Sequence, residues 1–370
     1  MIERFPGLAD RTYLNSCSYG LSPVGARAVY ARWQAVMERF EDAAFGELYG
    51  ELEAFRDRLN RFVGGDAGSV WVDQSSSALL ARIALGLPRN GRHRVVTTDI
   101  EFPSAELLFG TLPNVEVQVV PSTDGAVRAE ELADAIDERT WMVFVSHATS
   151  VTGALLRDVA LLAERAHAKG AYVGLDVYQS VGVVPVDLGA MDVDFAVGGG
   201  HKWLLGAWDF GWAWLGPRAL EAHRPVAAGW IAGSDPFTFD HQRGLARDAR
   251  RLAAGAPDPL ASMLTAVGLD EVEQVGLEAV RSRSRLLTQR VVDRSRWPIA
   301  GPTEAEARGG TVCLRVPEAG RVAGALAERD IVVSARRLPD GAEGLRIAPH
   351  LYNTTEDIDR CLAALEEVIP

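Results

Sequence analysis

Short hydrophobic runs alternate with amphipathic segments along the middle of the chain. The runs are rich in β-branched and aromatic residues, whereas the segments between them repeat apolar residues every three or four positions, as one face of a helix does. The pattern predicts strands at 70–72, 94–98, 115–120, 141–146, 172–175, 194–197 and 211–215, and helices at 104–109, 130–136 and 156–169. Strands that alternate with helices predict an α/β fold, in which helices cover a mainly parallel sheet.

The two ends of the chain follow different patterns. Residues 1–20 are mostly irregular, so we expect them to dock on a smaller domain or at an active site. Helical periodicity runs from 24 to 62, and a long helical stretch at 260–292 leads into a second unit. This unit has predicted strands at 311–316, 331–334 and 345–348, and helices at 321–328 and 356–368. We therefore expect a large domain over 21–258, and a linking helix with a small α+β domain over 259–370.

Composition and charge exclude several classes of protein. Hydrophobic residues make up 48% of the chain and charged residues 24%, which is typical of a soluble globular protein. The net charge of −12 argues against nucleic-acid and anionic-membrane partners. No apolar run reaches transmembrane length, and the N-terminus lacks the apolar core of a signal peptide. The widely spaced cysteines and scattered histidines predict a cytoplasmic protein without a metal site.

Lysine is scarce in this chain. Of the 38 basic residues, Lys169 and Lys202 are the two lysines. Lys169 precedes a glycine at the predicted end of a helix, which is an ordinary surface position. Lys202 follows His201 and three glycines at the end of a buried run, so we expect a partly desolvated amine with a lowered pKa. Such an amine forms an imine with a carbonyl compound, whereas a guanidinium stays charged; the alternative is a lysine that reaches from a strand end to solvent.

Polar residues follow several of the predicted strands, where ligands bind in parallel sheets. Three serines at 75–77 open a helix and offer hydroxyl and backbone N–H groups to an anion, although one serine suffices for N-capping. Asp176 follows the buried run 171–175, where a carboxylate can keep a pyridine nitrogen protonated. With Lys202 as the Schiff-base lysine and Phe102 against the ring face, these positions predict a site for a phosphorylated pyridine cofactor.

Three segments of the chain resemble the class-V aminotransferase family of fold-type I pyridoxal-phosphate enzymes. They are 176–180 with 184–187, then 201–204, and 345–357 near the C-terminus. The resemblance covers nearly the whole chain. It implies pyridoxal 5′-phosphate as the cofactor, bound by the large domain, with Lys202 and Asp176 as catalytic residues.

On the cofactor side, the resemblance assigns further residues. Ser75 and Ser76 would bind the phosphate, and Phe102 would stack on the ring, as in kynureninases. Gln179 would donate a hydrogen bond to the phenolic oxygen. His201 would flank the cofactor near its phosphate.

On the substrate side, the resemblance implies that Arg346 holds the α-carboxylate of an amino acid, which a guanidinium can bind bidentately. Tyr19, Gly20 and Trp230 resemble segments that line the substrate in epimerase-like and kynureninase-like members. In such enzymes the partner subunit often completes the site. The expected partners are therefore a small-molecule amino acid and a second copy of the chain, in a homodimer with shared active sites.

The same cofactor supports several reactions. We favour a lyase that cleaves a Cβ–heteroatom bond, such as a C–S bond, by β-elimination. An aminotransferase, an epimerase of the isopenicillin N epimerase type and a non-catalytic binding protein remain alternatives. Residues 334–341 contain no cysteine, which disfavours the persulfide chemistry of the family's cysteine desulfurases. The reaction type is left open, because groups around the cofactor that the sequence does not identify decide between these outcomes. The substrate is left open as well.

Overall fold

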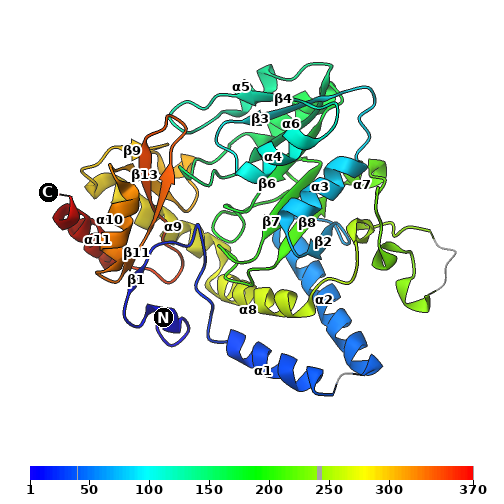
Figure 1. The fold of residues 1–370 in the computed structure, drawn as a ribbon, viewed down its shortest axis with the longest axis horizontal. Helices are drawn as coiled ribbons and strands as arrows, with labels where there is room; N and C mark the ends of the chain where they lie inside the picture. Colours follow the sequence, from blue (N-terminus) through cyan, green and yellow to red (C-terminus); the bar gives the residue numbers. More distant parts are fainter. Residues whose placement is uncertain (40, 240–243, 370) are drawn as a thin grey trace.

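A seven-stranded sheet forms the centre of the larger part of the molecule (Figure 1). The structure is a computed structural model, and it describes residues 1–39, 41–239 and 244–369. The strand order is β2-β8-β7-β6-β5-β3-β4, and all pairs are parallel except those of β8. The strands are β2 (Val70–Asp73), β3 (Arg94–Thr98), β4 (Glu116–Val120), β5 (Thr140–Ser146), β6 (Tyr172–Asp176), β7 (Phe195–Gly199) and β8 (Gly211–Leu215). The predicted mainly parallel sheet is confirmed.

Helices cover both faces of this sheet. Alternate residues of β5 enter different hydrophobic clusters: Val143 and Val145 pack with α2 and α6, whereas Met142 and Phe144 pack with α3 and α4. This two-sided burial explains why the strands read as continuous apolar runs. The helices of this part are α2 (Asp42–Phe62), α3 (Ser76–Gly86), α4 (Pro103–Thr111), α5 (Ala129–Asp134), α6 (Val159–Ala168), α7 (Pro217–Ala222) and α8 (Pro259–Val275).

Two predicted long helices are each divided, so the expectation of continuous helices was wrong. The segment 24–62 forms α1 (Ala26–Met37) and α2, and Glu41 between them has an extended backbone; Phe40 lies outside the described residues. The segment 260–292 breaks at Gly276, whose φ of +86° favours glycine, into α8 and α9 (Leu277–Arg294). Hydrophobic periodicity resumes after each break, so it does not reveal the change of direction.

The C-terminal part contains a four-stranded antiparallel sheet in the order β12-β13-β10-β9. Its elements are β9 (Ile299–Ala300), β10 (Val312–Arg315), β12 (Ser334–Arg337) and β13 (Glu343–Ile347), with α10 (Ala319–Ala327) and α11 (Thr355–Val368). The predicted strand at 331–334 is divided between β11 (Ile331–Val332) and β12. Short 3₁₀ helices are η1 (Pro6–Leu8), η2 (Trp230–Ala232), η3 (Pro236–Thr238), η4 (Ala249–Leu252) and η5 (Ala305–Ala307).

The N-terminal segment packs along this C-terminal part. Its strand β1 (Thr12–Tyr13) pairs in parallel with β11, and Asn15 bridges to Ala348 beyond β13. The blue N-terminal trace therefore passes between the two sheets (Figure 1). The division of the chain at residues 20 and 258 stays a prediction. Within the three described stretches, no helix has the length and apolarity that a membrane span requires.

Candidate active site

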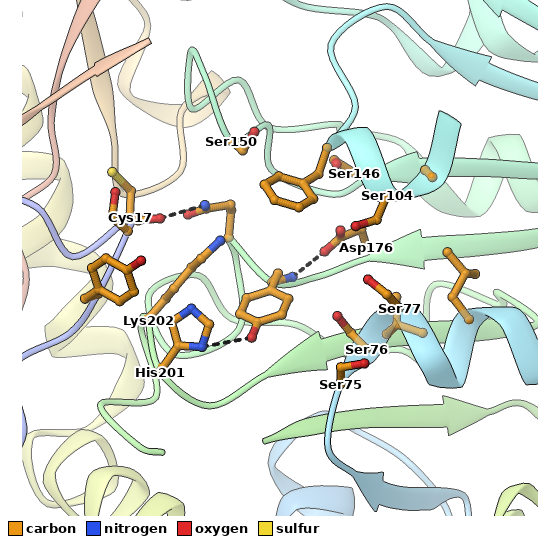
Figure 2. Close-up of a pocket in the computed structure, with 18 of the residues that line it drawn as sticks. Cys17, Ser75, Ser76, Ser77, Ser104, Ser146, Ser150, Asp176, His201 and Lys202 are labelled. Carbon is orange, nitrogen blue, oxygen red and sulfur yellow. Dashed lines mark hydrogen bonds between the residues drawn. The ribbon is translucent and has the colours of Figure 1, made fainter. Parts of the chain in front are cut away.

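A cavity of about 380 Å³ lies where the carboxyl ends of β5, β6 and β7 meet the N-terminal segment and the C-terminal sheet. Ser75, Ser76 and Ser77 lie at one side of this space and Lys202 at the other, with Asp176 between them (Figure 2). All but two of the site residues expected from the sequence line this cavity: Tyr19, Ser75, Ser76, Phe102, Asp176, Gln179, His201, Lys202 and Arg346. Residues far apart in the chain are thus brought to one place.

Lys202 follows β7 and places its amine among aromatic rings. The Nζ atom lies 4.4 Å from the centroid of the Tyr178 ring and 5.6 Å from that of Phe102. Burial lowers the pKa of Lys202 to about 8, although the nearby Asp176 carboxylate opposes this shift. A substantial fraction of the amine is therefore neutral near physiological pH, as a nucleophilic or basic lysine needs to be.

Asp176 ends β6 and has one carboxylate oxygen already held in place. Its Oδ1 accepts a hydrogen bond of 2.8 Å from the Tyr178 backbone N–H. Burial raises the pKa of Asp176, while this hydrogen bond and the charge of Lys202 act in the opposite direction. Among the residues the structure describes, no group donates a hydrogen bond to Oδ2. The free oxygen fits a protonated ring nitrogen, which would also favour the ionised carboxylate.

The three serines at the start of α3 have different roles. Ser75 is the N-cap, and its Oγ accepts a 3.1 Å hydrogen bond from the Ala78 N–H. For this residue the alternative of plain N-capping therefore applies. The hydroxyls of Ser76 and Ser77 have no hydrogen-bond partner within the described stretches, and both line the cavity. Together with the N-terminal end of the helix dipole, they fit an anion such as a phosphate.

Gln179 is oriented by two neighbours. Its Oε1 accepts a 2.9 Å hydrogen bond from the indole N–H of Trp203, and its Nε2 donates one of the same length to the Cys17 carbonyl. An indole N–H only donates, so the amide orientation is determined. Nε2 keeps a second hydrogen, which fits the phenolic oxygen that the sequence resemblance assigned to it.

His201 lies in a stack of rings at the mouth of the cavity. Its centroid is 4.8 Å from that of Trp208 with an interplanar angle of 16°, and Tyr19 stacks on the same indole at 4.5 Å. Its Nδ1 is 3.1 Å from the Tyr178 hydroxyl. Burial and the charge of Lys202 lower the pKa of His201 to about 4, so the imidazole is neutral at physiological pH.

Arg346 is a buried guanidinium, only 1% exposed, with hydrogen bonds to neutral groups. Its Nη2 donates to the hydroxyls of Ser18 at 2.7 Å and Ser334 at 2.9 Å, and its Nη1 donates to the Ser150 carbonyl. In the described part of the chain it makes no ion pair with a carboxylate. Burying an unpaired charge is costly, so this guanidinium is prepared for an anionic ligand.

Two expected substrate-side residues do not line the cavity. Trp230 lies in η2 on the surface of its own chain, where its ring stacks on Phe239 with a centroid separation of 5.5 Å. Gly20 touches the site through its backbone: its N–H donates a 2.7 Å hydrogen bond to the His201 carbonyl. A Cβ at Gly20 would come within 2.1 Å of the Lys202 carbonyl oxygen, so glycine is required there by close packing.

Several cavity residues were not assigned to the site from the sequence, namely Ser18, Tyr178 and Trp208. Tyr178 and Trp208 lie within a few positions of Asp176 and Lys202, and this proximity is the signal that could have identified them. Trp203, Trp212 and Trp214 are buried in the core, whereas Trp208 is 63% exposed. Hydrophobicity alone does not distinguish a core indole from a cavity indole.

Glu101 adds a second carboxyl group behind the cavity wall. Its Oε2 accepts hydrogen bonds from the backbone N–H of Ser146 at 2.8 Å and from the Ser146 hydroxyl. Its Oε1 accepts a 2.6 Å hydrogen bond from Thr98. Burial raises the pKa of Glu101 to about 7, and the Asp176 charge contributes to this shift. The group orients Ser146, a lining residue at the end of β5.

Comparison with known proteins agrees with this geometry. The family model for class-V aminotransferases matches residues 25–361. The chain belongs to the class-V aminotransferase family. It is 29% identical to isopenicillin N epimerase from Streptomyces clavuligerus (88% of this chain and 86% of the relative) and 29% identical to kynureninase from Deinococcus radiodurans (97% and 90%). It is 26% identical to the uncharacterized aminotransferase YcbU of Bacillus subtilis (96% and 94%).

Solved structures show the same fold at lower sequence identity. A cysteine desulfurase from Thermococcus onnurineus NA1 matches with a TM-score of 0.87 and 21% identity, over 100% of this chain and 97% of that chain. The cystine C–S lyase C-DES, in complex with cysteine persulfide, matches with a TM-score of 0.88 and 21% identity, over 99% and 100%. This class-V aminotransferase homologue thus has the fold-type I architecture. It is a pyridoxal-phosphate enzyme with lyase or transferase activity, as the sequence resemblance predicted.

Proposed function

We propose that this enzyme is a lyase that cleaves a Cβ–heteroatom bond, such as a C–S bond, of an α-amino acid by β-elimination. An amino-acid substrate is supported mainly by Arg346. Its buried guanidinium has no carboxylate partner in the described chain, and it lines the same cavity as Lys202. An α-carboxylate would neutralise this guanidinium, and a Cα proton would then come within reach of the amine.

The cofactor is proposed to lie across the cavity from α3 to β13. Ser76 and the N-terminus of α3, with Ser75 as its cap, would hold the phosphate, and Asp176 would hold the ring nitrogen. Gln179 would donate to the phenolic oxygen, and Phe102 would cover one ring face. When bound, pyridoxal phosphate supplies an electron sink that stabilises negative charge at Cα.

Arg346 and Lys202 would then have separate roles in the elimination. Arg346 binds the substrate carboxylate and orients the Cα–H bond. The Lys202 amine, with its pKa lowered to about 8, accepts the Cα proton and can return a proton to the leaving sulfur. If the one amine performs both transfers, they take place on the same side of the substrate.

The segment in which the family's cysteine desulfurases carry their persulfide nucleophile has no thiol in this chain, which separates this proposal from cysteine desulfuration. The free Cys17 does line the cavity, but it comes from the N-terminal segment and not from that position. Residues 334–341, which form β12 and the turn that follows it, contain no cysteine. Cys313 and Cys361 are buried with raised thiol pKa values, which makes them poor nucleophiles. The homodimer with shared active sites stays a prediction, and so does the substrate-side role of Trp230.

Product analysis with an S-substituted L-cysteine distinguishes the reactions. A β-elimination consumes one water and yields one equivalent each of the thiol, pyruvate and ammonia. An aminotransferase, supplied with a 2-oxo acid as amino acceptor, converts the substrate to its own 2-oxo acid and the acceptor to an amino acid. Because the Cβ–S bond stays intact, it releases neither thiol nor ammonia. An epimerase exchanges the Cα hydrogen with deuterated solvent and forms the D-isomer. Thiol, pyruvate and ammonia are expected in equal amounts. Either of the other product sets would contradict the lyase assignment and identify an aminotransferase or an epimerase instead.

Substitution of Asp176 by asparagine is expected to preserve cofactor binding and to reduce kcat by about tenfold or more. A tenfold loss corresponds to an increase of about 1.4 kcal/mol in the activation free energy. A neutral amide cannot stabilise the pyridinium form, so electrons are withdrawn from Cα less strongly. Steady-state kinetics with a measured cofactor content tests this expectation. Turnover within about threefold of wild type, at equal cofactor content, would show that Asp176 does not support the electron sink.

A further inference from the structure

A second guanidinium group lines the cavity beside that of Arg346. Arg336 comes from β12 and Arg346 from the neighbouring strand β13. In this antiparallel pair Arg346 lies opposite Ser334. Arg336, two residues further along β12, lies opposite Gly344. Because side chains alternate between the faces of a sheet, the two arginines share one face as diagonal neighbours, a relation that typically separates residues by about 7–8 Å.

The charge of Arg336 is not neutralised within the described part of the chain. Its Nη1 donates a 2.8 Å hydrogen bond to the Ala335 carbonyl, and it forms no ion pair with a carboxylate of the described residues. The cavity is lined by the carboxylates of Asp176, which is assigned to the ring nitrogen, and of the exposed Asp209. Two like charges on neighbouring strands thus face one space without a counter-ion. They repel each other unless an anion occupies that space.

The pKa values of the neighbouring groups show that these charges act at the same place. Burial lowers the pKa of Lys202, against the effect of Asp176, and the charges of both arginines lower it further. Burial and the charge of Arg346 lower the pKa of Arg336 in turn. A guanidinium stays protonated despite such a shift. The substrate side of the cavity is therefore positively charged, although the whole chain has a net charge of −12.

The proposed ligands leave one guanidinium over. The phosphate of the cofactor would lie at the start of α3, and the α-carboxylate of the substrate would occupy the planar fork of Arg346. An amino acid with a neutral side chain then offers nothing to Arg336. An anionic group at the end of the substrate side chain would balance the remaining charge.

We propose that the substrate is an S-substituted cysteine whose substituent ends in an anionic group such as a carboxylate, and that Arg336 binds this group. The inference rests on the proposed function, and it adds the class of substrate and a residue that determines specificity. During elimination the Cβ–S bond breaks and the sulfur takes up a proton. The anionic group leaves unchanged as part of the thiol.

A matched pair of substrates tests the inference. S-carboxymethyl-L-cysteine and S-carbamoylmethyl-L-cysteine have nearly the same shape, but only the acid carries a second negative charge. Wild-type kcat/KM is expected to be about three- to fivefold higher for the acid, because an exposed guanidinium contributes about 1 kcal/mol or less. The ratio of acid to amide should fall to about one in Arg336→Gln. Charge reversal in Arg336→Glu should bring it below one.

Arg337 is the matched control. It follows Arg336 on β12, so its side chain lies on the opposite face of the sheet, and it does not line the cavity. Arg337→Gln removes the same charge from the same strand and should keep the wild-type ratio of acid to amide. Added NaCl should reduce the preference of the wild type for the acid, since salt screens exposed charges.

Binding without turnover provides an independent measurement. The desamino analogues of the two substrates lack the α-amino group, so they bind without entering the reaction. Calorimetry on the cofactor-loaded enzyme should give a Kd about three- to fivefold lower for the acid than for the amide. Arg336→Gln should bind the two analogues with equal Kd, whereas Arg337→Gln should discriminate between them as wild type does.

The outcomes separate this inference from the function on which it rests. Equal kcat/KM and equal Kd for acid and amide in wild type would overturn it and leave the lyase in place. An equal loss for both substrates in Arg336→Gln would assign Arg336 to the α-carboxylate, which overturns it as well. If neither substrate yields thiol, pyruvate and ammonia, the proposed function fails. A lower Kd for the acid analogue would then still support an anion site at Arg336, and equal values would overturn that site too.

Discussion

Replacement of Lys202 by arginine is expected to remove covalently bound pyridoxal phosphate and to lower turnover by at least about 10²- to 10⁴-fold, the range typical of a lost acid–base group. A guanidinium remains protonated at every accessible pH, so it provides neither a nucleophile nor a base. Mass spectrometry of the borohydride-reduced wild-type protein should show the cofactor mass on the peptide that contains Lys202. The arginine variant should show no such mass.

Lys169 provides a matched control, because it is the other lysine of the chain. It is exposed beside α6, and its Nζ forms a 2.6 Å ion pair with Glu138. Lys169→Arg keeps that charge and should retain both the cofactor mass and full turnover. A reduced cofactor on Lys169, or none on Lys202, would contradict the assignment of the active-site lysine.

The pH dependence of cofactor uptake provides a second measurement on the same amine. Burial lowers the pKa of Lys202 from 10.5 to about 8, so the neutral fraction grows about tenfold per pH unit below 8 and levels off above it. The rate at which apoprotein gains visible absorbance should follow this curve. An amine with an unshifted pKa would give a rate that still rises steeply between pH 8 and pH 10.

The location of the site was predictable because it depends on the ends of parallel strands. Apolar runs marked the strands, and the polar residues after them had to meet at one edge of the sheet. The scarcity of lysine then distinguished Lys202 from the rest of the basic residues. These signals are local in sequence, and the structure brings Ser76, Asp176 and Lys202 to one cavity as this reasoning predicts.

The sequence did not reveal how distant segments complete the site. Arg346 is surrounded by Ser18, Ser150 and Ser334, which come from three separate segments. Their neutral groups satisfy the guanidinium without cancelling its charge. The orientation of Gln179 likewise depends on Trp203, which lies in a different loop. Such tertiary contacts leave no periodic pattern in the chain.

Local resemblance does not show where a side chain points within its own chain, because tertiary packing decides that. Trp230 shares its Gly-Trp neighbourhood with substrate-lining segments, yet in this chain it packs against Phe237 and Phe239 outside the cavity. Gly20 acts through its backbone, because Lys202 and Leu205 leave no room for a side chain. A motif specifies residue types, whereas the direction in which each side chain points depends on the loops around it.

Substitution of Arg346 by alanine is expected to lower kcat/KM by roughly 30-fold to several thousand-fold, because loss of a buried charge-assisted pair costs about 2–5 kcal/mol. The guanidinium would hold the α-carboxylate equally in the ground state and the transition state. Loss of such uniform binding appears mainly as a raised KM. The proposed attachment of the cofactor to Lys202 does not involve Arg346, so cofactor content and colour should remain those of wild type.

Arg336 and Arg337 on β12 are the rival guanidinium groups and serve as controls. Both are exposed, and Arg336 also lines the cavity, where its Nη1 donates a 2.8 Å hydrogen bond to the Ala335 carbonyl. An exposed guanidinium is screened by water and contributes about 1 kcal/mol or less, so each alanine variant should change KM by about fivefold at most. The three variants are to be assayed on one amino-acid substrate. The assignment fails if Arg346→Ala keeps the wild-type KM while Arg336→Ala or Arg337→Ala loses substrate binding.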